Sequence, residues 1–203
     1  MAKAIMQSAS QGEACHIERD EKVSMYAYCL FCQTQRARTI AQILEHIGIE
    51  RAFVPQVVNA HRVKGHNEEK VYDLFPGYVF FYSKDLITDY DHICRLSGVI
   101  RILNHHDGGC ALSDQDYSFA MGLYEKNGTI DKMRIVKAGD QVRVEEALFR
   151  NIEATVLKVD YRKKRAKIAY HFDKHDWTTW VACDVLYTEN KDSNSESTHD
   201  AEI

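Results

Sequence analysis

The hydrophobic pattern of this chain changes near residue 137, and this change most constrains its fold. Before it, apolar runs typical of strands alternate with apolar stripes at helical spacing. After it, apolar residues recur at every second position, as at Val142 and Val144 and again at Ile168 and Tyr170. Alternating helices and strands favour an α+β sandwich, whereas many short strands favour a small β-barrel. The sequence therefore predicts two domains of different class.

The first part of the chain predicts the element order β-α-β-β-α-β-α. Thr34 is expected to cap a helix whose apolar stripe ends at Gly48, and Ser113 with Asp116 resembles a capping box for the last helix. The polar stretch 59–70 predicts an exposed hairpin or loop. The strands are expected at 24–32, at 51–58, after a Pro-Gly turn within 74–82, and at 99–103, and the middle helix at 88–95.

Composition and charge refine this division. The segment 134–188 carries 11 basic and 8 acidic residues, a net charge of +3, whereas the tail 189–203 carries 1 and 5, a net charge of −4. A basic second domain suits contact with nucleic acid. The expected boundaries are a disordered tail at 1–23, a first domain at 24–126, a linker at 127–136, a second domain at 137–188 and a disordered acidic tail at 189–203.

The sequence lacks signals for a membrane, for secretion and for catalysis. It has no apolar run of about 18 residues and no basic flank followed by an apolar stretch at its start. The six scattered cysteines favour a reducing compartment. No nucleophile elbow, phosphate-binding loop or dinucleotide fingerprint is present. We therefore expect a monomeric cytoplasmic protein that is not an enzyme and needs no cofactor.

Two groups of residues could be read as metal sites. Cys29 and Cys32 form a CxxC, but residues three apart on a strand face opposite ways. His171, His175 and Cys183 could supply zinc ligands, although histidines in a polar loop are more often surface residues. We expect no metal at either place.

Two motifs resemble those of one known family. Leu74-Phe75-Pro76-Gly77-Tyr78-Val79-Phe80 resembles the signature of the NusG amino-terminal (NGN) domain, and Ala138-Gly139-Asp140-Gln141-Val142-Arg143-Val144 resembles the opening of the KOW domain that follows it. The resemblance covers about residues 24–188. It implies an α+β fold, an NGN α/β sandwich followed by a small five-stranded KOW β-barrel, in a transcription elongation factor that binds RNA polymerase.

Other segments resemble specialised members of the family. Residues 111–117, 124–130 and 158–167 are similar to the LoaP branch of antiterminators, which is associated with recognition of RNA hairpins. The segment 172–177 departs from the general elongation factor, which places its contacts with Rho or a ribosomal protein in doubt. The resemblance implies an antiterminator. The alternatives are a general elongation factor and a KOW-containing RNA-binding or ribosome-associated protein.

The resemblance also implies a docking surface for the clamp helices of the largest polymerase subunit. Aromatic side chains suit such an interface because they bury much area with little loss of entropy. A purely structural role in the core remains the alternative for them, and a solvated helix start is the alternative for the polar pair. The residues implied are Phe31, Tyr78, Phe80 and Phe75. Asp89 and His92, at the start of the second helix, are implied in a second contact, with the gate loop of the polymerase.

A basic turn in the second domain is the candidate RNA contact. Clustered Arg and Lys could hold a phosphate backbone, and Tyr161 could stack on a base. A solvated turn without a ligand is the alternative. The residues implied are Lys158, Tyr161, Arg162, Lys163, Lys164, Arg165 and Lys167, and the partner would be a nascent RNA hairpin.

Overall fold

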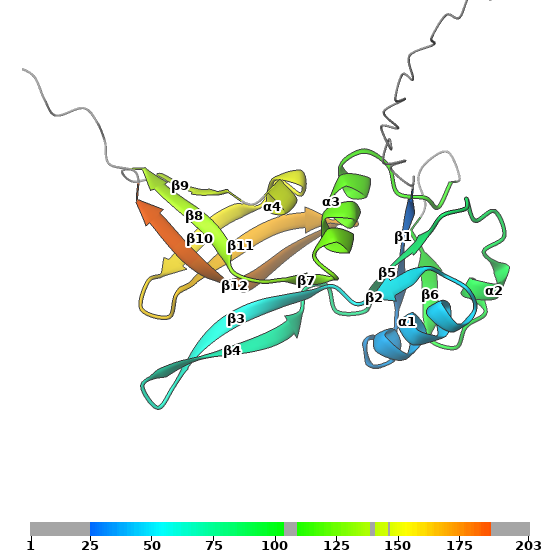
Figure 1. Ribbon diagram of the computed structural model, residues 1–203, viewed down its shortest axis with the longest axis horizontal. Helices are drawn as coiled ribbons and strands as arrows, with labels where there is room; N and C mark the ends of the chain where they lie inside the picture. Colours follow the sequence, from blue (N-terminus) through cyan, green and yellow to red (C-terminus); the bar gives the residue numbers. More distant parts are fainter. Residues whose placement is uncertain (1–24, 104–108, 139–140, 146, 188–203) are drawn as a thin grey trace, which may run out of the picture.

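A computed structural model describes residues 25–103, 109–138, 141–145 and 147–187 (Figure 1). The expected tails at 1–23 and 189–203 lie outside the described residues. No helix in the described part of the chain has the length and apolarity needed to cross a bilayer.

The first part of the chain folds around a four-stranded antiparallel sheet of order β2-β5-β1-β6. Side chains alternate along β1, so Leu30 packs under α1 and α2 while Cys29 packs in the cluster that contains α3. Helices therefore cover both faces of the sheet, as expected for an α/β sandwich (Figure 1). The strands are β1 (Tyr26–Cys32), β2 (Arg51–Phe53), β5 (Tyr78–Ser83) and β6 (Val99–Ile102), and the helices are α1 (Ala37–His46), α2 (Asp91–Cys94) and α3 (Asp114–Glu125).

The helix starts differ from the expected ones in their hydrogen bonds. Thr34 begins a single 3₁₀ turn, Thr34–Arg36, and no side chain caps α1. Ser113 directly precedes α3, but its hydroxyl donates to Asp114 instead of capping a backbone amide. The middle helix begins at Asp91 rather than near 88, because the Asp89 carboxylate accepts the Asp91 amide at 2.9 Å and holds the preceding turn.

The expected strand at 51–58 is broken at Val54-Pro55, where proline supplies no amide hydrogen. Beyond the break, β3 (Gln56–Val63) and β4 (His66–Asp73) form a hairpin, one of the two alternatives expected for the polar stretch. It is closed by Lys64 and Gly65, with φ values of 47° and 91°. This is the two-residue turn whose twist suits a hairpin. Strand β7 (Thr129–Ile130) pairs in parallel with β3. The segment expected to be a linker is thus partly built into the fold.

The last part of the chain is a curled five-stranded sheet of order β10-β11-β12-β8-β9. Its outer strands β9 and β10 approach each other, an arrangement consistent with a KOW-like barrel. The period-two pattern is realised on β11, where Ala166, Ile168 and Tyr170 face the core. The elements are β8 (Met133–Ala138), β9 (Gln141–Val144), α4 (Ala147–Asn151), β10 (Thr155–Asp160), β11 (Arg165–Phe172) and β12 (His175–Tyr187).

One apolar core runs through both parts of the chain. Buried residues of β5 and α3 pack in the same cluster as residues of α4, β11 and β12. Helix α3 lies between the four-stranded sheet and the curled sheet in Figure 1. The two units therefore share a packed boundary, and this boundary positions the candidate site.

Candidate functional site

The Pro76-Gly77 turn directs the aromatic residues of β5 into the boundary between the two units. Gly77 has a φ of 90°, and a Cβ atom there would lie 2.8 Å from the Cys32 carbonyl oxygen. Only glycine fits without displacing β1. The Cys32 amide donates to the Gly77 carbonyl at 2.8 Å, which fixes the turn against the end of β1. Phe75 and Tyr78 flank this turn, and their ring centroids lie 6.1 Å apart.

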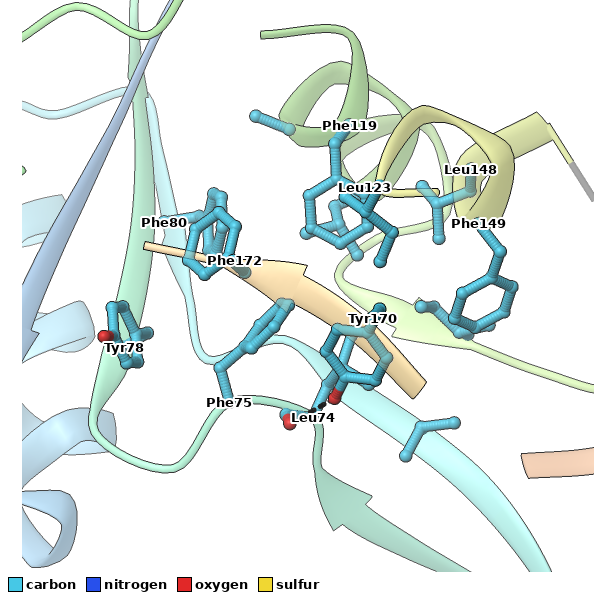
Figure 2. Close-up of a cluster of buried hydrophobic side chains, with 14 of the residues drawn as sticks. Leu74, Phe75, Tyr78, Phe80, Phe119, Leu123, Leu148, Phe149, Tyr170 and Phe172 are labelled. Carbon is cyan, nitrogen blue, oxygen red and sulfur yellow. Dashed lines mark hydrogen bonds between the residues drawn. The ribbon is translucent and has the colours of Figure 1, made fainter. Parts of the chain in front are cut away.

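Phe75 inserts into an aromatic pocket of the curled sheet (Figure 2). Its ring centroid lies 4.5 Å from that of Phe172, 5.5 Å from that of Tyr170 and 5.7 Å from that of Trp177. The Tyr170 hydroxyl donates to the Leu74 carbonyl oxygen at 3.2 Å. Burial of this tyrosine raises its pKa and keeps the hydroxyl protonated as a donor.

A polar contact flanks this aromatic packing. The Tyr78 hydroxyl donates to Asp173 Oδ2 at 2.6 Å, and the Arg101 guanidinium donates to the same oxygen. Asp173 has only 8% of its side chain exposed, whereas the Arg101 side chain is 43% exposed. Desolvation raises the pKa of Tyr78, and the neighbouring carboxylate raises it further. We call this group of Tyr78, Arg101 and Asp173 the Asp173 bridge.

The four aromatic residues implied in polymerase binding are brought together. Phe31 lies 4.9 Å from Tyr78, and Phe75 lies 6.3 Å from Phe80, measured between ring centroids. Tyr78 is only 2% exposed, and Phe75 and Phe80 are fully buried, with Phe172 of the curled sheet against all three. Phe31 keeps part of its surface in contact with solvent. Three of the four therefore lie beneath the second unit.

Asp89 and His92 lie apart from this aromatic cluster. Both are exposed and form a pair across one turn, with 3.8 Å between His92 Nε2 and Asp89 Oδ2. Asp89 precedes α2, and His92 lies in its first turn. Helix α2 packs on the sheet face opposite to the one that carries Phe80. The structure thus places the two implied polymerase contacts at separate locations.

The candidate RNA residues gather at the β10–β11 turn. Tyr161, Arg162 and Lys164 are exposed, and the Asp160 carboxylate accepts the Lys163 amide at 3.1 Å to shape the turn. Lys158 and Lys167 face each other across β10 and β11. Arg165 differs from the others, because its side chain is only 13% exposed and its guanidinium stacks 4.3 Å from the centre of the Trp180 ring.

The two groups considered as metal sites do not converge. Cys29 and Cys32 lie in the clusters on opposite faces of the first sheet, and burial raises the pKa of the Cys32 thiol to about 11. His171 pairs with Asp176 at 2.9 Å beside the β11–β12 turn, whereas Cys183 is buried further along β12. Within the described residues no three potential metal ligands form a group.

Sequence reasoning missed several residues of the boundary. Asp173 and Arg101 received no role, although the departure at 172–177 marked that segment as unusual. A signal for the turn was present, since Asp173 and Lys174 stand between two period-two strands. Both adopt left-handed φ angles, 48° and 64°, as a two-residue hairpin turn requires. Nothing in the local sequence indicated that this turn contacts β5.

The fold and this boundary describe a two-part protein whose aromatic cluster is shared between its units. Residues 25–119 match the family model described as "Transcription termination factor nusG". The match is slightly shorter than half of the chain and spans the four-stranded sheet, the β3–β4 hairpin and the first half of α3. This part of the chain is similar to the NusG family.

The other comparisons add little to this assignment. A solved structure titled "Domain interaction in Thermotoga maritima NusG" is similar with a TM-score of 0.48 and 14% identity, over 78% of this chain and 93% of that chain. No curated protein matches the chain. The similarity to the NusG family therefore rests on residues 25–119.

Proposed function

We propose that this protein is a specialised NusG-family antiterminator. Its first unit binds the clamp helices of the largest RNA polymerase subunit through the aromatic cluster of Phe31, Phe75, Tyr78 and Phe80, and suppresses pausing and termination. Its KOW-like unit contacts nascent RNA through the β10–β11 turn. The observation that carries the proposal is the assembly of these aromatic side chains on one face of a sheet within the segment that matches the family.

The proposed contact requires the two units to separate. Phe172 packs against Phe75, Tyr78 and Phe80, so a polymerase helix cannot reach these rings in the closed arrangement. Phe31 alone among the four offers solvent-accessible surface, and the Arg101 guanidinium lies 6.0 Å from the centre of its ring. The closed form is therefore a resting state, and polymerase binding stabilises an open one at the expense of the Asp173 bridge.

The affinity of the full chain for purified RNA polymerase core tests this function. Phe31→Ala should weaken binding about tenfold or more, as expected for a central aromatic anchor. Because Phe31 is only partly buried, this variant should remain folded, and its thermal midpoint checks this. Ile47→Ala is the matched control, since Ile47 is an exposed apolar residue beyond the end of α1. Absence of binding by the unmodified chain would remove polymerase as the partner.

The alternative of a general elongation factor makes a different prediction. Such a factor uses its KOW domain for Rho or a ribosomal protein and has no preference for one transcript. In this chain the segment 172–177 is engaged with β5. Antitermination confined to templates that carry a particular RNA hairpin would favour the specialised role, and equal activity on all templates would favour the general one.

A further inference from the structure

We infer that the RNA-binding surface spans both units, continuing from the outer face of β10, β11 and β12 onto the β3–β4 hairpin, where Lys70, His61 and Tyr72 take part. The inference rests on the proposed RNA contact of the β10–β11 turn. It adds residues of the NGN-type unit to a site that the sequence placed in the KOW-like unit alone.

The strand register defines the outer face of the curled sheet. Ala166 and Ile168 point into the core, so Arg165 and Lys167, which alternate with them along β11, lie on the opposite face. The register places Lys158 and Trp180 on either side of Lys167. Two lysines directly opposite each other repel, and no ion pair to either is found among the described residues. An anionic ligand across this face would relieve the repulsion.

The hairpin adjoins this face at the Arg165 end. Val58 and Ala60 of β3 pack with Ala182, and Ala182 is the register partner of Arg165. The hairpin extends beside the curled sheet in Figure 1. Lys163 and Arg165 on one unit and Lys70 on the other all act on His61, lowering its pKa in addition to the larger effect of desolvation. Cations from both units therefore act on one side chain.

Basic residues outside the hairpin pair with two of its three acidic side chains. Asp73 pairs with Arg38 at 2.5 Å, and Glu69 pairs with Lys132 at 2.9 Å. Glu68 lies across from His61 in the register and is the remaining acid of the two strands. Lys64 and Lys70 are exposed. The hairpin consequently presents a positive surface although its own charges nearly balance.

Aromatic side chains accompany these cations and point to RNA rather than to an acidic protein. Tyr72 is 42% exposed, and its hydroxyl lies 3.0 Å from His61 Nε2 with the two rings 5.5 Å apart. Tyr161 is 48% exposed at the turn, and Trp180 is held by its stacking on Arg165. Unpaired bases in RNA loops stack on such rings while lysines and arginines hold the phosphates.

Fluorescence anisotropy of the full chain with a labelled RNA stem-loop tests the inference. The probe is a stem of ten base pairs with a mixed-sequence unpaired loop, titrated at several salt concentrations. Lys70→Gln should lower the affinity about fivefold and reduce the slope of log K against log salt by about 1. Tyr72→Leu should lower the affinity about tenfold with an unchanged slope, because stacking is not ionic. Lys84→Gln, an exposed lysine paired with Glu50 on the first unit, is the control and should leave binding unchanged.

The outcomes separate this inference from the proposed function. Loss of affinity in Lys163→Gln and in the two hairpin variants would support both. Loss in Lys163→Gln with unchanged affinity in Lys70→Gln and Tyr72→Leu would overturn the two-unit surface and leave the turn as the site. Failure of the unmodified chain to bind the probe at low salt would overturn both. A thermal midpoint close to that of the unmodified chain confirms that each variant is folded.

Discussion

Asp173→Asn should open the boundary between the two units. Asparagine has nearly the shape of aspartate and tolerates the left-handed φ of 48° at this position, so the turn itself should persist. Its amide oxygen can still accept the Tyr78 hydroxyl. Its neutral amide can no longer form an ion pair with the Arg101 guanidinium. In the unmodified chain this guanidinium donates to the Asp173 carboxylate, whose side chain is 8% exposed.

The expected magnitude follows from the kind of bond that is lost. A hydrogen bond to a charged group contributes about 2 kcal/mol, and here the charged acceptor Asp173 is the buried partner. The closed form should lose about this much relative to the open form, a change of about 30-fold in their ratio. While the open form stays the minority, the apparent affinity for polymerase rises in proportion to its population. Asp173→Asn should therefore bind RNA polymerase core about 30 times more tightly.

The assay is a titration of labelled protein with polymerase core, with Asp176→Asn as the matched control. Asp176 lies near the same β11–β12 turn, carries the same charge and has a side chain that is 95% exposed, and it pairs only with His171 among the described residues. This control should bind as the unmodified chain does. Equal affinities for Asp173→Asn and Asp176→Asn would refute the view that the Asp173 bridge restrains polymerase binding.

Three further outcomes are expected. Lys174→Gly should raise the free energy of unfolding by about 1 kcal/mol, because glycine adopts the φ of 64° without strain; an unchanged or lower thermal midpoint would contradict this. The lowered pKa of His61 means that this imidazole binds a proton more weakly in the folded state than in the unfolded state. The free energy of unfolding should therefore fall as the pH decreases below 6.5. Denaturant unfolding at pH 7.5 and at pH 5.5 should show that His61→Gln loses less free energy of unfolding between these pH values than the unmodified chain does. An equal loss in both proteins would contradict this role of His61. Asp173→Asn should weaken the RNA stem-loop complex while strengthening the polymerase complex, because separating the units divides the RNA surface; parallel changes in both affinities would be inconsistent with a surface that spans them.

Much of the local structure could be predicted because it depends on neighbouring residues. The apolar, aromatic-rich run at 24–32 predicted the strand that the structure forms at Tyr26–Cys32. Gly65 marked the β3–β4 turn, and the period of two after residue 137 indicated the curled sheet. These features are set by side-chain direction and by backbone φ, both of which are local properties.

The boundary could not be predicted because its contacts join distant parts of the sequence. Tyr78 and Asp173 are 95 residues apart, and neither is unusual among its neighbours. The expected linker offered no sign that Thr129 would pair beside Gln56 in a parallel bridge. A family resemblance pointed to an aromatic surface, but hydrophobic pattern alone cannot distinguish a ring that docks a partner from one that packs against the second half of the same chain.

Binding to an isolated clamp-helix fragment of the polymerase tests the central claim most directly. The fragment, a two-helix coiled coil, is titrated calorimetrically into the Asp173→Asn protein and into the same protein carrying Phe31→Ala. The account predicts binding by Asp173→Asn and a loss of about tenfold or more when Phe31 is also removed. Absence of binding by Asp173→Asn, or equal binding by both proteins, would show that the aromatic cluster serves the core of this molecule and not the polymerase.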